Sequence, residues 1–122
     1  MDIKQYWDAV IKQDKKGLSN FFHNNACIRW HNTNEQFSVK QFISANCEYP
    51  GEWEGNIERI ENLENLVVTV TKIWEKDKEL MFHVVSFIKI QDDKIIAIDE
   101  YWGDDGDAPQ WRIDLNIGSK IN

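Results

Sequence analysis

The second half of the chain consists of four long apolar segments that are separated only by short polar turns. We expect strands at residues 53–60, 66–74, 80–90 and 94–102, joined by turns at 62–65, 75–78 and 91–93. Turns this short join antiparallel strands, because a parallel pair needs a crossover connection of a dozen residues or more. The sequence therefore predicts an antiparallel meander in this half of the molecule.

The first half has the spacing of helices. Asp2 is expected to cap a helix that ends near Gly17, and a short helical turn follows at 18–22. A pair of short strands is expected at 26–31 and 36–37, with Ser38 capping a third helix over 39–47 that Pro50 stops. Helices followed by hairpin-connected strands predict an α+β fold with a mostly antiparallel sheet.

Size and charge limit the possible functions. A chain of 122 residues with 42% hydrophobic residues fits one domain over 1–122, with its core at about 2–112 and a C-terminal tail at 113–122. The net charge of −7 argues against nucleic acid and acidic membranes, because both need clustered Lys and Arg. No apolar run could cross a bilayer, and the N-terminus has an amphipathic helix pattern, so a cytoplasmic protein is expected. Cys27 and Cys47 lack metal-ligand spacing, and neither a metal nor a cofactor is expected.

The last predicted strand places a carboxylate, Glu100, among large apolar side chains. Burying an unpaired carboxylate is costly and raises its pKa, so Glu100 is the best candidate for a functional group. A three-residue loop at 91–93 would pair Ile90 with Lys94. Three facing pairs then share one face: Phe82 with Trp102, Val84 with Glu100, and Ser86 with Ile98. A two-residue loop would shift the register by one and turn Glu100 toward the face of His83.

Both faces of this hairpin are largely apolar, although a small sheet with one solvated side needs only one apolar face. One face must meet the helices. We expect the other to pack against a second copy of the sheet in a symmetric homodimer. That face contains Met81, His83, Val85, Phe87, Ala97 and Tyr101. Partial cover by the C-terminal tail is the alternative.

The order of elements, with the segments ACIRWHN and KIIAIDEYWGDDG, resembles the nuclear transport factor 2-like superfamily and, within it, the SnoaL-like proteins. The resemblance covers about residues 2–112 and implies a cone, in which a strongly bent sheet wraps around three N-terminal helices and leaves a pocket at the open end. In epoxide hydrolase relatives the last strand places an acid in the cavity, at the position of Glu100. Those enzymes also use an Arg and a second Asp, which residues 66–74 do not supply, so an epoxide hydrolase is not expected. The isomerase relatives use a Tyr on the first helix, and Tyr6 is loosely similar.

Candidate site residues follow from these two arguments. Glu100 is the candidate acid or base, and Tyr6 is a weaker candidate that could equally be plain core. Glu100 could instead be neutralised by Arg112, Arg29 or Lys72. His31 could line the cavity mouth or be held by a local carboxylate such as Glu35. Candidate ligand-binding residues are Trp7, Trp30, His31, Trp53, Phe82, Val84, Ile98, Trp102, Trp111 and Arg112.

Two functions follow as hypotheses. The first is a SnoaL-like domain whose pocket holds a small, largely apolar metabolite, with isomerase, cyclase or dehydratase chemistry at Glu100. The second is a non-enzymatic module of the same fold that binds a ligand or a protein partner. The fifteen aromatic residues favour a pocket or a partner in either case, because large amphipathic rings line cavities and interfaces.

Overall fold

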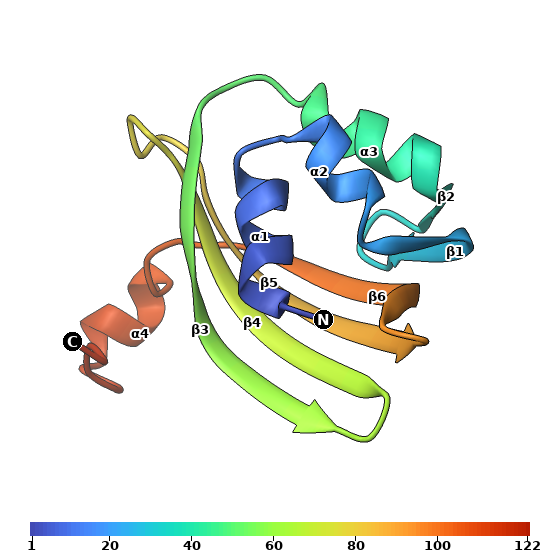
Figure 1. Cartoon of the computed structure of the whole chain (residues 1–122). Coiled ribbons are helices and arrows are strands. Elements are labelled where there is room, and N and C mark those ends of the chain that lie inside the picture. The colour runs from blue at the N-terminus through green and yellow to red at the C-terminus, as the bar shows by residue number, and fades with distance from the viewer.

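One six-stranded sheet, strongly bent, forms the body of the molecule (Figure 1). The computed structural model describes residues 1–122 without a gap. The strands are β1 (Phe22–Trp30), β2 (Glu35–Ser38), β3 (Trp53–Leu63), β4 (Leu66–Glu75), β5 (Met81–Gln91) and β6 (Lys94–Asp104), in the order β2-β1-β6-β5-β4-β3. All neighbours are antiparallel except β1 and β6, which pair in parallel. The predicted α+β class and the antiparallel meander are confirmed.

Three helices occupy the concave side of this sheet, as Figure 1 shows: α1 (Ile3–Ile11), α2 (Lys15–Ser19) and α3 (Val39–Cys47). The caps of α1 and α3 are those predicted, since Asp2 accepts from Lys4 N–H and Ser38 forms a capping box with Gln41. The predicted end of the first helix near Gly17 is wrong. Asp14 accepts from the backbone N–H of Gly17 and so begins a separate helix. The helix α2 therefore starts three residues before the helical turn predicted at 18–22, and β1 starts at Phe22.

The core lies between the helices and the concave face of the sheet. Tyr6, Trp7, Leu18 and Phe42 supply its largest helix side chains, and each is at most 2% exposed. The helix α1 approaches β3 closely at Gly55, where an added Cβ would lie 2.7 Å from the backbone oxygen of Lys72 and 2.9 Å from Cδ1 of Ile11. A side chain at residue 55 would therefore separate α1 from the sheet.

The hairpin between β5 and β6 has a different register from the one predicted. The loop has two residues, Asp92 and Asp93, both with positive φ, and Gln91 pairs with Lys94. A β-bulge follows, because Ile90 pairs with Ile95 while Lys89 pairs with Ala97, so the strand contains one extra residue. The extra residue restores the face assignment that the short loop alone would have reversed. Glu100 therefore faces inward, but opposite Ser86 rather than Val84.

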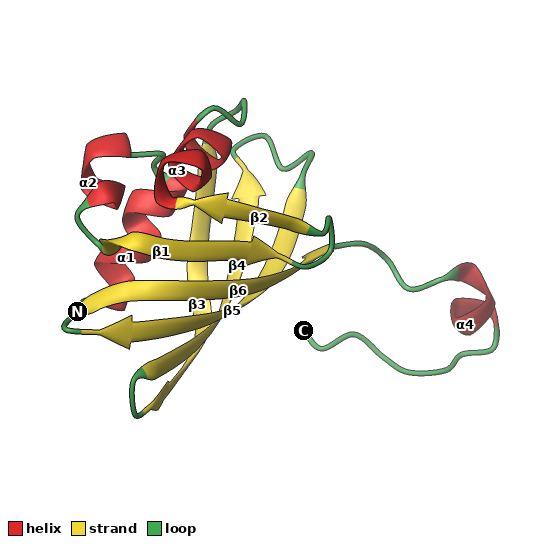
Figure 2. Ribbon diagram, turned by 90° about the vertical axis from the view of Figure 1, so that its right-hand side faces the viewer, coloured by secondary structure: helices red, strands yellow, loops and turns green.

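A fourth helix, α4 (Gln110–Asp114), was not predicted. Figure 2 shows it at the end of an extended segment, away from the other three helices. Apart from the half-buried Arg112, its side chains and those that follow are exposed, with Trp111 58%, Leu115 66% and Ile121 102% accessible. No helix of the molecule is both long and apolar enough to span a membrane.

Candidate functional site

Glu100 is buried at the centre of the concave face and is 2% exposed. Its Oε1 accepts a hydrogen bond from the indole Nε1–H of Trp30 at 3.0 Å, and its Oε2 accepts one from the hydroxyl of Ser86 at 2.5 Å. These partners come from the two strands on either side of β6, since Trp30 pairs with Glu100 in β1 and Ser86 pairs with it in β5. The carboxylate is thus held on both sides by neutral donors.

No cation reaches Glu100. It takes part in none of the ion pairs of the molecule, and the alternative that Arg112, Arg29 or Lys72 neutralises it is therefore wrong. Burial raises the pKa of Glu100 to about 7, and the hydrogen bonds from Ser86 and Trp30 oppose this rise. The indole N–H of Trp102 also lowers the pKa, although it does not reach hydrogen-bond geometry. Glu100 therefore exchanges a proton near neutral pH.

A cavity of about 630 Å³ opens between α1, the end of α3 and the ends of the bent strands. Its volume lies in the range that small-molecule sites occupy. Five aromatic rings line it, those of Trp30, Tyr49, Trp53, Phe82 and Trp102. The other lining residues are Val10, Ile11, Gln13, Asn32, Thr33, Ala45, Asn46, Ile73, Gly103 and Asp104.

Glu100 lies behind the wall of this cavity. Trp30 and Trp102 both line the cavity and both direct their indole N–H groups toward the carboxylate, and their ring centroids are 6.1 Å apart. Glu100 itself is not among the lining residues. A molecule in the cavity therefore meets the two indoles first and reaches Glu100 only if one of these rings moves.

The sequence-derived site residues fall into three groups. Trp30, Trp53, Phe82 and Trp102 line the cavity. Tyr6, Trp7, Val84 and Ile98 are buried in the core, where Trp7 donates to the hydroxyl of Thr69 at 3.1 Å. His31, Trp111 and Arg112 lie elsewhere: His31 bonds Asp99 at 2.7 Å, not Glu35, and Arg112 lies over the ring of Trp111 in α4.

Tyr6 has an unpaired hydroxyl in the core. Burial raises the pKa of this phenol well above its usual value, and the negative charge of Glu100 raises it further. Tyr6 therefore stays protonated at physiological pH and senses the charge of Glu100. It does not line the cavity, so it has no direct contact with a molecule bound there.

Several cavity residues were not singled out from the sequence. Gln13, Asn32, Asn46 and Tyr49 come from turns and helix ends, where no periodic pattern marks a side chain as inward-facing. Ser86 could have been found, because the predicted hairpin already placed it on the face of Glu100.

The outer face of the sheet carries its own polar network. The imidazole of His83 bonds Asp105 through Nδ1 at 2.5 Å and Glu58 through Nε2 at 3.0 Å. The hydrogen bond to Asp105 raises the pKa of His83, and the charges of both carboxylates add to this effect. Nearby, His31 stacks on Tyr101 with a centroid distance of 4.5 Å and an interplanar angle of 9°. His83 thus faces away from the cavity.

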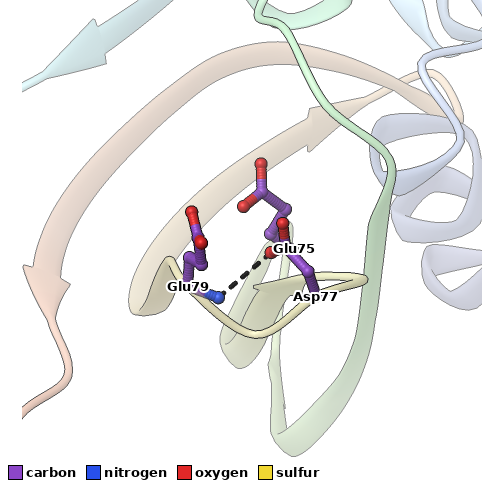
Figure 3. A group of neighbouring side chains, drawn as sticks. All are labelled: Glu75, Asp77 and Glu79. Atoms are coloured by element: carbon purple, nitrogen blue, oxygen red, sulfur yellow. Dashed lines mark hydrogen bonds between the residues drawn. The ribbon is translucent and has the colours of Figure 1, made fainter.

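Three carboxylates, Glu75, Asp77 and Glu79, gather at the turn between β4 and β5 (Figure 3). Their oxygens lie within 4.8 Å of one another. Asp77 accepts from the backbone N–H of Glu79 at 3.1 Å, and its hydrogen bond with Glu75 raises the pKa of Glu75 and lowers that of Asp77. Hydrogen bonds within the turn and contact with solvent account for this cluster.

Comparisons with known proteins bear on the fold. No family model matches the chain, and no curated protein matches it. Among solved structures, an NTF-2-like protein of unknown function from Burkholderia xenovorans shares 19% identity with a TM-score of 0.79, covering 98% of this chain and 92% of that one. A candidate ketosteroid isomerase from Kribbella flavida shares 15% identity at a TM-score of 0.80, with 98% and 87% covered.

A candidate SnoaL-like polyketide cyclase from Shewanella putrefaciens is also similar, with 19% identity, a TM-score of 0.66 and coverage of 82% and 79%. These likenesses establish architecture, and fold alone does not define function. The chain has the nuclear transport factor 2-like fold, as its sequence resemblance implied.

Proposed function

We propose that the protein binds a small, largely apolar molecule in the cavity between α1 and the bent sheet. The observation that carries this proposal is the lining itself, in which five aromatic rings surround about 630 Å³ of space. Concave sites lined by aromatic side chains with a few polar groups are the usual form of a ligand pocket. Four candidates from the sequence, Trp30, Trp53, Phe82 and Trp102, contribute to this lining.

A blocking substitution tests the proposal without knowledge of the natural ligand. Ala45 lines the cavity from α3, so Ala45→Phe should fill it, whereas Ala108→Phe adds the same ring at an exposed position. The neutral fluorescent probe N-phenyl-1-naphthylamine should bind the wild type and Ala108→Phe, and lose at least tenfold in affinity for Ala45→Phe. Equal binding to all three would place the probe outside the cavity and contradict the proposal.

Acid/base catalysis at Glu100 is a second candidate function. It is favoured by a pKa of about 7, which matches the requirement of a general acid or base at neutral pH. The substrate would have to displace the ring of Trp30 or Trp102, because both stand between Glu100 and the cavity. Isomerisation or dehydration would follow from proton abstraction beside a carbonyl or from protonation of a leaving oxygen.

Exchange of α-protons reports this chemistry with a simple ketone. In D2O, 2-tetralone should exchange its α-protons faster with the wild type than with buffer, as followed by proton NMR. Glu100→Gln should abolish the acceleration while leaving probe binding nearly intact. Acceleration that persists in Glu100→Gln would remove Glu100 from the catalytic role, and no acceleration by the wild type would favour a binding module.

We also propose a cytoplasmic homodimer that forms through the outer face of the sheet. The support is that Phe87 and Tyr101 remain 38% and 46% exposed on that face, next to Met81, Val85 and Ala97. Tyr101→Lys should yield a monomer in analytical ultracentrifugation, and Tyr49→Lys, an exposed Tyr away from this face, serves as the control. A monomeric wild type would refute the dimer.

A further inference from the structure

The aromatic rings of the cavity form one continuous arc. Consecutive ring centroids are 5.3 Å apart from Tyr49 to Trp53, 5.9 Å to Phe82, 6.1 Å to Trp102 and 6.1 Å to Trp30. The neighbours are tilted or edge-to-face, with interplanar angles from 35° to 85°. All five rings line the same cavity, and the negative potential of an aromatic face attracts a cation within about 6 Å of its centroid.

Two of these rings lie against the carboxylate of Glu100, and the hydrogen bond that Trp30 donates to it makes that ring more electron-rich. The indole N–H of Trp30 donates to Glu100, and that of Trp102 is directed toward the same carboxylate. The charge of the ionised carboxylate then acts through the indoles on the cavity side. Both effects favour a positive group in the cavity and disfavour a negative one.

The polar residues of the lining also favour a positive ligand over a negative one. No Lys, Arg or His lines the cavity, and its single charged residue is Asp104, an exposed carboxylate for which the structure has no ion pair or side-chain hydrogen bond. The side-chain amides and the Thr33 hydroxyl already donate within the protein, whereas the indole N–H of Trp53 has no partner. Gln13 donates to the carbonyls of Asn46 and Tyr49, Asn46 donates to that of Val10, Asn32 to that of Trp102, and Thr33 to the carboxylate of Glu35.

A phosphate or carboxylate ligand would therefore find neither a cation nor a set of free amide donors in the lining. An ordinary primary ammonium would lack acceptors for its three N–H groups over most of the aromatic wall. A fully methylated, quaternary ammonium needs no such acceptors, because it has no N–H and its charge is spread over an apolar surface. That combination matches an arc of rings with one carboxylate at the mouth.

We propose that the ligand of the cavity is a small organic cation of the methylated ammonium class, held by the arc of Trp30, Tyr49, Trp53, Phe82 and Trp102 with Asp104 at its mouth. The inference rests on the proposed binding function and specifies the ligand class for the same cavity. The methylated nitrogen lies among the rings, where it has lost its hydration shell, and its substituent extends past Asp104 toward solvent.

A pair of isosteric probes separates charge from shape. Phenyltrimethylammonium and tert-butylbenzene have the same outline, and only the first is charged. Binding is followed by tryptophan fluorescence and by NMR shifts of the indole N–H signals. The cation should bind at least tenfold more tightly than the neutral isostere. Equal or tighter binding of tert-butylbenzene would overturn this inference and leave the proposed binding function intact, whereas binding of neither probe would contradict both.

Two variants test the residues named. Asp104→Asn should weaken cation binding at least threefold with no change for the neutral probe, and Asp107→Asn, which makes the same charge change outside the lining, should leave both affinities unchanged. Phe82→Leu keeps an apolar wall but removes one π face, so it should cost the cation at least threefold more than the neutral probe. Equal losses for both probes in both variants would refute the role of charge.

Discussion

Replacing Glu100 by Gln should remove a pH-dependent cost of folding. Glu100 has an ordinary pKa of 4.5, which burial raises to about 7 in the folded protein. Between these two values the unfolded chain has lost the proton while the folded chain keeps it, so the folded state loses stability as the pH rises. One pKa unit corresponds to about 1.4 kcal/mol, and the total loss is therefore about 3 kcal/mol.

The stability lost through Glu100 depends on pH in a definite way. It is about 1 kcal/mol at pH 5, about 2 kcal/mol at pH 6, and levels off at about 3 kcal/mol above pH 7. Gln has the shape of Glu100, accepts from Trp30 through its oxygen, and can donate to the hydroxyl oxygen of Ser86, but it does not titrate. The variant should therefore match the wild type near pH 4 and exceed its stability at pH 8.

Urea unfolding followed by tryptophan fluorescence at pH 4 to 8.5 measures this difference. Because the wild type and the variant share every other titrating group, the difference between them isolates residue 100. Glu64→Gln, at an exposed position, is the matched control and should show no trend with pH. A difference that stays constant from pH 4 to 8.5, or a variant that becomes less stable as the pH rises, would refute the reasoning.

Three further outcomes follow from single contacts. Ser86→Ala should raise the pKa of Glu100 further, because the hydroxyl favours the ionised form, and carboxyl carbon NMR would show a lower or unchanged pKa if this account is wrong. Gly55→Ala should destabilise the fold by about 1–3 kcal/mol in urea unfolding, since its methyl group meets the backbone of Lys72, whereas Gly106→Ala should have little effect. His83→Gln should lower the melting temperature most below pH 6.5. The raised pKa of His83 stabilises the fold at low pH, and this stabilisation is lost as the pH rises through the pKa that His83 has in the folded protein. A drop in melting temperature that is largest at pH 8.5 would contradict this account.

The sequence was informative where a pattern had only one physical solution. Ser38 could be recognised as the cap of a helix, and the apolar run over residues 66–74 between two short polar turns required a strand. The face of Glu100 was predicted from an incorrect loop length. Because Ile95 and Ile96 are both apolar, the alternation around them does not reveal that one residue is extra, and the bulge stays hidden.

The cavity was harder to predict than the fold. The relation between Glu100 and the cavity depends on which way the rings of Trp30 and Trp102 turn, and packing among β1, β6 and α3 decides that orientation. The partner of Glu100 was sought among distant cations such as Arg112, but the partners present are its neighbours on the adjacent strands. Charge suggested a cation as the partner of Glu100, whereas strand pairing determined that its partners are Trp30 and Ser86.

The bulge beside Ile96 makes the two faces of the last strand depend on chain length. Ile95 and Ile98 are both buried although they are three residues apart, which regular alternation forbids. Deleting one residue here would exchange the faces, sending Asp99 and Tyr101 into the core and Glu100 and Trp102 to the surface. Substitutions at these positions change one side chain, but a single deletion would invert the whole strand. Homologues should therefore tolerate varied residues in this hairpin and conserve its length.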